Sequence, residues 1–125
     1  MSHSHVTLPT HDVEATASFL EKTLSYTRAA QPANSSAGPV WLTIPNGQQI
    51  QVLFQEGFSV SPFDGDIGHF AIFHPATRFA ELKQRLERFG AQVFAPKNPS
   101  RFERFFFREP VNGYVFEVFA SHFDQ

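Results

Sequence analysis

The chain contains no cysteine. Without thiols it has no disulfide, no zinc–thiolate site and no thiol nucleophile, so catalysis would rely on imidazole, carboxylate or hydroxyl groups, or on a metal held by nitrogen and oxygen ligands. The chain also lacks an excess of basic residues, because 10 Lys and Arg side chains stand against 12 Asp and Glu, a formal net charge of -2. Nucleic acids and anionic membranes are normally bound by clustered Lys and Arg, so we expect neither partner.

Long apolar runs are missing too. No stretch approaches the ~20 apolar residues of a membrane helix, and the N-terminal segment MSHSHVTLPTHD has no basic region followed by an apolar run. We therefore expect a cytoplasmic protein. The 125 residues, 42% of them hydrophobic, are typical of one globular domain spanning 1–125 with a real core. Of the 16 Phe, only 3 precede Phe63, so the second half has the aromatic excess.

The first half of the chain has the pattern of one strand, one helix and three further strands. A helix is predicted over 12–24, because Val13, Ala17, Leu20 and Leu24 form one apolar stripe and Asp12 is a good N-cap. The Asn46-Gly47 pair predicts a hairpin turn. The strands are expected at 5–10, 26–31, 40–44 and 49–55.

The second half repeats this order. Its helix is predicted over 76–89, with Phe79, Leu82, Leu86 and Phe89 at helical spacing and Gly90 as its C-cap. Its strands are expected at 68–74, 91–95, 101–108 and 114–120. The sequence therefore predicts an α+β chain made of two β-α-β-β-β modules, the first at about 5–55 and the second at about 68–120.

Both modules place chemistry-bearing residues at equivalent positions. The opening strands carry His5 and His69, and the closing strands carry Gln51 and Glu117 inside apolar runs. The separations are similar, 46 residues from His5 to Gln51 and 48 from His69 to Glu117. A buried carboxylate is costly without a metal or cationic partner. Two imidazoles and a carboxylate suit Fe(II), and are also acceptable to Mn, Ni, Co or Zn.

Three motifs, HVTLPTHDVEATASFLEKTL, GHFAIFH and FFFREPVNGYVFEVF, resemble those of the glyoxalase, bleomycin-resistance and extradiol-dioxygenase group, the vicinal oxygen chelate superfamily. The resemblance runs from about His5 to Ala120. It implies two modules that form a cup-shaped mixed sheet, usually in a homodimer, although the modules of one site may come from one chain or from two. It also implies a divalent metal, which in this chain would be held by His5, Gln51, His69 and Glu117.

One ligand position departs from the family pattern. Many relatives have Glu where this chain has Gln51, which is a weaker, neutral oxygen ligand and cannot act as a base. For each ligand a simpler role stays open: His5 could be an exposed histidine, with His3 as the competing ligand, Gln51 and His69 could be ordinary sheet or core residues, and Glu117 could form a salt bridge. The candidate partners of Glu117 are Arg101, Arg104 and Arg108. The remaining histidines, His11, His74 and His122, are interpreted as surface or capping residues.

Strand alternation predicts which side chains share a face with Glu117 and His69. Phe70, Phe116 and Val118 should face the opposite layer, and His74 should point away from the metal. The expected inward-facing neighbours are Val115, Phe119, Ala71 and Phe73. With Thr7 from the first strand, they predict a largely apolar substrate pocket, made by Thr7, Ala71, Phe73 and Phe119.

The leading hypothesis is a glyoxalase-like enzyme that acts on a small molecule with a chelating oxygen end and an apolar part. The metal would act as a Lewis acid, and Glu117 would be the catalytic residue that moves a proton, unless metal-bound water does so. Three alternatives stay open. An Fe(II) ring-cleaving dioxygenase is disfavoured because Tyr114 has the wrong parity for a proton carrier. A fosfomycin-type thiol transferase could use Thr7 and nearby cations, and a metal-free binding protein could hold an aromatic drug or metabolite.

Overall fold

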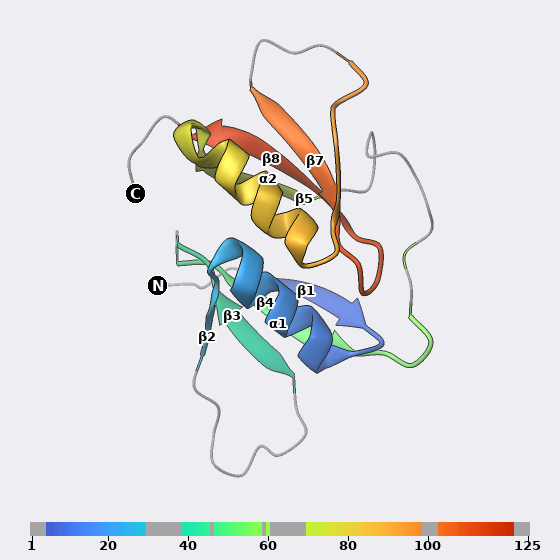
Figure 1. Ribbon diagram of the computed structural model, residues 1–125. Helices are drawn as coiled ribbons and strands as arrows, with labels where there is room; N and C mark the ends of the chain where they lie inside the picture. Colours follow the sequence, from blue (N-terminus) through green and yellow to red (C-terminus); the bar gives the residue numbers. More distant parts are fainter. Residues whose placement is uncertain are drawn as a thin grey trace. The chain divides into compact units, whose positions relative to one another are not determined.

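The structure is a computed structural model that describes residues 5–29, 39–45, 47–58, 60, 70–98 and 103–121 (Figure 1). The chain divides into two compact units, Met1–Ser59 and Val60–Gln125. Each unit has a four-stranded mixed sheet and a helix in the order strand, helix and three strands. The predicted α+β class and the repeated β-α-β-β-β order are therefore confirmed. Neither helix in the described ranges is long and apolar enough to cross a membrane.

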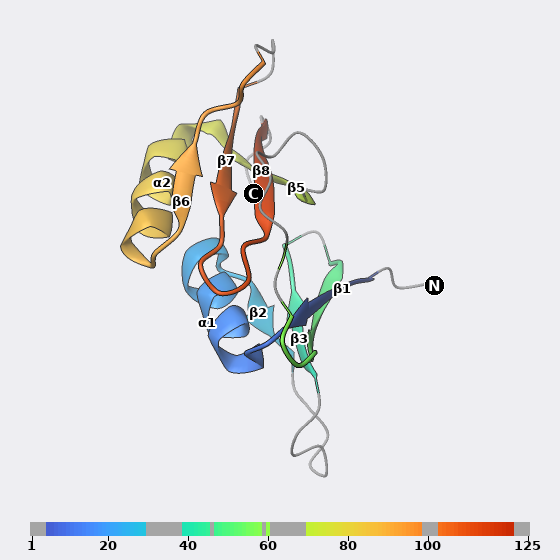
Figure 2. The ribbon, with the colours of Figure 1, turned by 90° about the vertical axis from the view of Figure 1, so that its right-hand side faces the viewer.

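The first unit is built on a parallel pair formed by its first and last strands. β1 (His5–Thr10) lies parallel to β4 (Gln49–Phe54), and β3 (Val40–Thr43) continues the sheet antiparallel to β4. β2, expected over 26–31, is limited to Thr27–Arg28 in the described residues and completes the strand order β1-β4-β3-β2. Figure 2 shows α1 (Val13–Leu24) on one side of this sheet.

Local signals explain where α1 begins and ends. Asp12 is the N-cap, and its side-chain oxygen accepts the Ala15 N–H at 3.0 Å. At the other end Ser25 takes the left-handed conformation, with φ 63°. Ala17, Leu20 and Leu24 are buried as their spacing predicts, whereas Val13 is half-buried. The apolar stripe therefore packs against β3 and β4.

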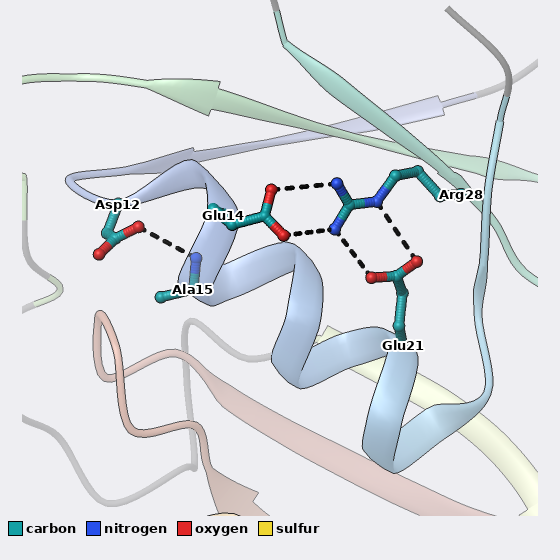
Figure 3. A network of polar contacts seen from close by, with 5 residues as sticks. All are labelled: Asp12, Glu14, Ala15, Glu21 and Arg28. Atoms are coloured by element: carbon teal, nitrogen blue, oxygen red, sulfur yellow. Dashed lines mark hydrogen bonds and ion pairs between the residues drawn. The ribbon is translucent and has the colours of Figure 1, made fainter.

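Arg28 ties the end of β2 to two turns of α1 (Figure 3). Its guanidinium donates to both Glu14 oxygens at 3.0 Å and to both Glu21 oxygens at 2.8 and 3.3 Å. Hydrogen bonding from Arg28 lowers the pKa of Glu14 below its usual value. Because the Glu14 side chain is largely exposed, water screens this pair, and it contributes little to stability.

The second unit repeats the parallel pairing. β5 (Phe70–Pro75) lies parallel to β8 (Val115–Ser121), followed in the sheet by β7 (Arg104–Arg108) and β6 (Gln92–Phe94). The predicted helix over 76–89 begins as a short 3-10 segment, Ala76–Arg78, and becomes α2 at Phe79–Arg88. Pro75, the last residue of β5, directly precedes this segment and keeps an extended conformation, with φ -57° and ψ 130°.

Aromatic rings fill the space between α2 and the second sheet. Phe79 of α2 packs edge-on against Phe105, with ring centroids 5.0 Å apart. Phe107 stacks on Phe116 at 4.8 Å, and both rings are almost completely buried. Phe89, expected to complete the apolar stripe of the helix, is 38% exposed because it follows the last helical residue, Arg88. The Phe excess of the second half thus serves mainly this packing.

The β7–β8 turn is organised by the buried carboxylate of Glu109. One oxygen accepts the Val111 N–H at 2.6 Å, and the other accepts those of Asn112 at 2.9 Å and Tyr114 at 3.2 Å. Glu109 satisfies backbone donors that would otherwise be buried without acceptors.

We predict that Glu109→Gln lowers the free energy of unfolding by about 1–3 kcal/mol, because an amide retains only one acceptor oxygen and sets an NH2 group against backbone N–H donors. Urea denaturation followed by circular dichroism measures the change. Glu103→Gln, at an exposed position on the same hairpin, is the matched control. Equal stability of the two variants would show that the Glu109 carboxylate does not hold the turn.

His74 lies on the helix-covered face of β5, as its strand parity predicts, so the interpretation of His74 as a surface or capping residue is wrong. Its Nε2 is buried and has no hydrogen-bond partner in the described part of the chain. Burial lowers the pKa of His74 below its ordinary value of 6.5, and the nearby cations Arg85 and Arg78 lower it further, against a smaller opposing effect of Glu81. Protonation is therefore less favourable in the folded protein than in the unfolded chain.

A lowered folded-state pKa means that the unfolded chain binds the proton first, so stability is present above about pH 6.5 and is lost as the pH falls below it. We predict that thermal denaturation of the wild type shifts to lower temperature between about pH 7 and about pH 5, and that His74→Gln reduces this shift. His11→Gln removes an exposed histidine for comparison. A pH dependence unchanged by His74→Gln would contradict this assignment.

Candidate functional site

The open face of the first sheet, opposite α1, presents Thr7 and Gln51 side by side. These residues are register partners on β1 and β4, and Trp41 of β3 is the next partner across the sheet. The Thr7 hydroxyl donates to the Gln51 side-chain oxygen at 3.1 Å. Ile50 and Val52 alternate to the buried side. Because an amide oxygen has two lone pairs, the bond from Thr7 is compatible with a further ligand on Gln51.

Part of the predicted metal site lies outside the described structure. The backbone of His5 opens β1 opposite Gln49, which is two residues before Gln51 on the same strand. The side chain of His5 lies outside the described part, as do all of His69, the competing ligand His3, the candidate salt-bridge partner Arg101 and the predicted surface residue His122. The four-ligand set therefore stays a prediction. Its two described side chains, Gln51 and Glu117, belong to different units.

Glu117 occupies the centre of the open face of the second sheet. It lies on β8 between its register partners Ala71 of β5 and Phe106 of β7, and its side chain is 6% exposed. The expected alternation is confirmed, because Phe119 contacts Phe73 on this face, with ring centroids 5.9 Å apart, while Phe116 contacts Phe70 on the other. A carboxylate thus lies within a mostly aromatic surface.

Arg104 is the cationic partner of this carboxylate. Its Nη1 donates to Glu117 Oε2 at 2.5 Å, and its Nη2 donates to the carbonyl oxygen of Asn98 at 3.0 Å. Arg108, another predicted candidate, donates to the Gly113 carbonyl oxygen in the turn at 3.1 Å. Of the three arginines considered from the sequence, the structure thus shows Arg104 in the salt bridge.

The pair does not remove the capacity of Glu117 to bind a metal. A carboxylate has two oxygens and about four lone-pair positions, so the guanidinium does not take all of them, but a metal and Arg104 would compete for the single negative charge of the group. The expected donor set of imidazole nitrogen, amide oxygen and carboxylate oxygen suits Mn, Fe, Co, Ni or Zn. Within the described residues there is no group of three or more His, Cys, Asp and Glu side chains that could hold a metal.

The aromatic surface beside Glu117 is larger than the sequence predicts. Phe73 is 74% exposed, and Phe94 stacks on Phe106 with ring centroids 5.5 Å apart and planes 10° from parallel. Alternation alone could not identify Phe106, because it lies in a run of three consecutive Phe. The β7–β8 register shows which of the three lies on the Glu117 face, because it pairs Phe106 with Glu117. The open face therefore joins one ion pair to several aromatic rings.

No protein-family model matches the sequence, and the comparison with curated proteins finds no significant match. Solved structures, however, are similar over nearly the whole chain. FosX, the fosfomycin resistance protein from Listeria monocytogenes, crystallised with Mn(II) and 1S,2S-dihydroxypropylphosphonic acid, has a TM-score of 0.76 and 20% identity, over 96% of this chain and 90% of that one.

Two further structures have the same architecture. A possible glyoxalase from Bacillus cereus has a TM-score of 0.71 and 21% identity, and the match covers 96% of this chain and 99% of that one. The oxidase ChaP-H2 has a TM-score of 0.71 and 22% identity, over 97% and 94% of the two chains. These similarities establish that the chain has the fold of the glyoxalase, bleomycin-resistance and dioxygenase group, the vicinal oxygen chelate fold.

Proposed function

We propose that this protein is a divalent-metal-dependent enzyme that resembles glyoxalase I and acts on a small molecule with adjacent oxygen atoms and an apolar part. The observation that carries the proposal is the Glu117 carboxylate, which is almost completely buried at the centre of an aromatic sheet face. A carboxylate at such a position is costly unless it is paired; Arg104 supplies the pairing in this structure, and a metal would supply it in the loaded enzyme. The fold, and the Mn(II) bound by FosX, support a catalytic use of this residue.

Each unit would supply two metal ligands. His5 and Gln51 come from the first unit, and His69 and Glu117 from the second. Because three of these are neutral, the bound ion would keep most of its positive charge and would act as a strong Lewis acid toward a carbonyl oxygen. We retain a homodimer as the expected assembly, and Mn, Fe, Co, Ni and Zn as the candidate ions.

Other steps of the reaction, namely proton transfer, substrate orientation and the exclusion of water, would fall to side chains of the protein. Glu117 would accept a proton from the carbon beside the substrate carbonyl and return it to the neighbouring position. Thr7 and Gln51 would orient polar groups of the substrate through their hydroxyl and amide. Ala71, Phe73 and Phe119 would contact its apolar part and exclude water from the reacting atoms.

A second candidate is the modification of a phosphonate, as in a fosfomycin-type thiol transferase. Two observations favour it: FosX binds a phosphonic acid together with Mn(II), and Arg104 brings a guanidinium to the face that carries Glu117. Thr7 would then contact the phosphonate. Fosfomycin consumption with and without an added thiol would separate this reaction from proton transfer beside a carbonyl.

We predict that protein purified without chelators contains a divalent metal, and that adding Mn, Ni, Co, Fe or Zn stabilises metal-free protein by about 2.7 kcal/mol at about 100 times Kd. Elemental analysis and thermal denaturation measure both effects. Glu117→Gln should abolish binding, while His74→Ala, on the helix-covered face, should leave it intact. Negligible metal content without any stabilisation would favour a metal-free binding protein for aromatic drugs or metabolites.

We also predict that the metal-loaded protein catalyses exchange of the C–H hydrogen beside the carbonyl of small α-hydroxycarbonyl compounds in deuterium oxide, followed by proton NMR. Glu117→Asp shortens the side chain but keeps its carboxylate, and should lower the rate by roughly 100-fold or more, because proton transfer depends on position. His11→Gln serves as the control. A Glu117→Asp variant with full metal content and wild-type exchange would exclude Glu117 as the proton carrier.

A further inference from the structure

Arg104 connects two parts of the second unit. One arm of its guanidinium reaches Glu117 on β8, and the other reaches the backbone of Asn98, in the segment after β6. The guanidinium carbon also lies 5.5 Å from the centroid of the Phe106 ring, a cation–π distance. Two of these three contacts, those to Asn98 and Phe106, do not depend on the state of Glu117.

The third nitrogen of the guanidinium, Nε, carries a further N–H donor. Arg104 Nε is buried and, among the residues that the structure describes, no acceptor takes its hydrogen. The whole side chain is 17% exposed, so water provides little compensation. A buried N–H without an acceptor is unfavourable, and an arginine presents its donors as a planar fork that suits carboxylate and phosphonate oxygens. Arg104 therefore has donor capacity beyond its bond to Glu117.

Charge balance changes once Glu117 binds a metal. In the resting protein the guanidinium and the carboxylate neutralise each other. A divalent ion on Glu117, with neutral ligands from His5, Gln51 and His69, leaves two positive charges in excess around the same carboxylate. Because breaking the partnership of a buried charge is strongly unfavourable, the guanidinium then requires another anion.

We propose that Arg104 exchanges its anionic partner, pairing with Glu117 in the metal-free protein and with an acidic group of the substrate when Glu117 holds the metal. This inference rests on the proposed function and narrows its substrate class to small molecules that carry a carboxylate or phosphonate beside the chelating oxygens. Asn98 and Phe106 keep the guanidinium in place during the exchange. Arg104 is then a specificity-determining residue, and Glu117 is held ready for the metal without being left unpaired.

The exchange predicts that metal and oxyanion bind cooperatively. An oxyanion that takes Arg104 frees Glu117, so it should tighten Mn²⁺ binding, and by linkage Mn²⁺ should tighten oxyanion binding by the same factor, about 5–150-fold. Isothermal titration calorimetry with Mn²⁺, alone and with methylphosphonate or acetate present, measures this factor. The two anions distinguish a phosphonate substrate from a carboxylate one.

Arg104→Met should have two effects. It should tighten binding of Mn²⁺ alone at least about 5-fold, because the competing cation is gone, and it should remove the cooperativity with the anion. Any cooperativity that comes from direct contact between the anion and Mn²⁺ persists in this variant. The difference between the wild type and the variant therefore measures the contribution of Arg104 alone. Lys83→Met removes the same charge from the helix-covered side, where Lys83 lies over Phe105, and should behave as the wild type. Arg104→Lys keeps the charge without the fork and should keep part of the cooperativity if Arg104→Met does not fold.

The outcomes separate the two proposals. If the wild type binds Mn²⁺, and Arg104→Met shows the same affinity and the same response to both anions, the partner exchange is wrong while the metal enzyme stands. Where Arg104→Met does not fold, undiminished cooperativity in Arg104→Lys has the same meaning. If neither the wild type nor the Arg104 variant binds Mn²⁺ with or without an anion, the proposed metal-dependent function fails, and the exchange fails with it. Cooperativity with one anion alone assigns the substrate class to that anion.

Discussion

The parallel pairing of the first and last strands within each unit is the constraint on which the rest of the structure depends. Parallel strands cannot be joined by a tight turn, so a helix and two further strands lie between β1 and β4 and again between β5 and β8. The crossing helix covers one face of each sheet, and the opposite face carries the candidate site residues. The same pairing sets Thr7 beside Gln51, and Ala71 beside Glu117, although more than 40 residues separate the members of each pair.

The two units use this framework for different chemistry. The open face of the first sheet carries neutral hydrogen-bonding groups, with the Thr7 hydroxyl joined to the Gln51 amide. The open face of the second carries the Arg104–Glu117 pair among aromatic rings. This division accounts for the uneven distribution of Phe along the chain. Rings on the helix-covered side fill the core, and those on the open side surround the carboxylate with apolar surface.

Most of the fold could be predicted from the sequence because its signals are local. Asp12 at the start of α1 and the helical spacing of Leu82 and Leu86 in α2 each indicate one structure, and the element order follows from them. Arg104 could not be chosen from three candidate arginines, because the choice depends on the cross-strand register. The prediction that Phe89 completes the apolar stripe of the helix is wrong, because helical spacing does not show that the helix ends at Arg88.

The Arg104–Glu117 contact also separates the functional hypotheses in physical terms. In a metal-free binding protein the pair would be structural throughout, and well-packed apolar residues of similar size could replace both charges with little loss of stability or even a gain. In a metal enzyme the carboxylate must keep its charge in two states, once facing Arg104 and once facing an ion. Only the metal enzyme requires an arginine that can pair with a different anion while it stays in the site. The contacts of Arg104 with Asn98 and Phe106 would keep the guanidinium in the site, because they do not involve the Glu117 carboxylate.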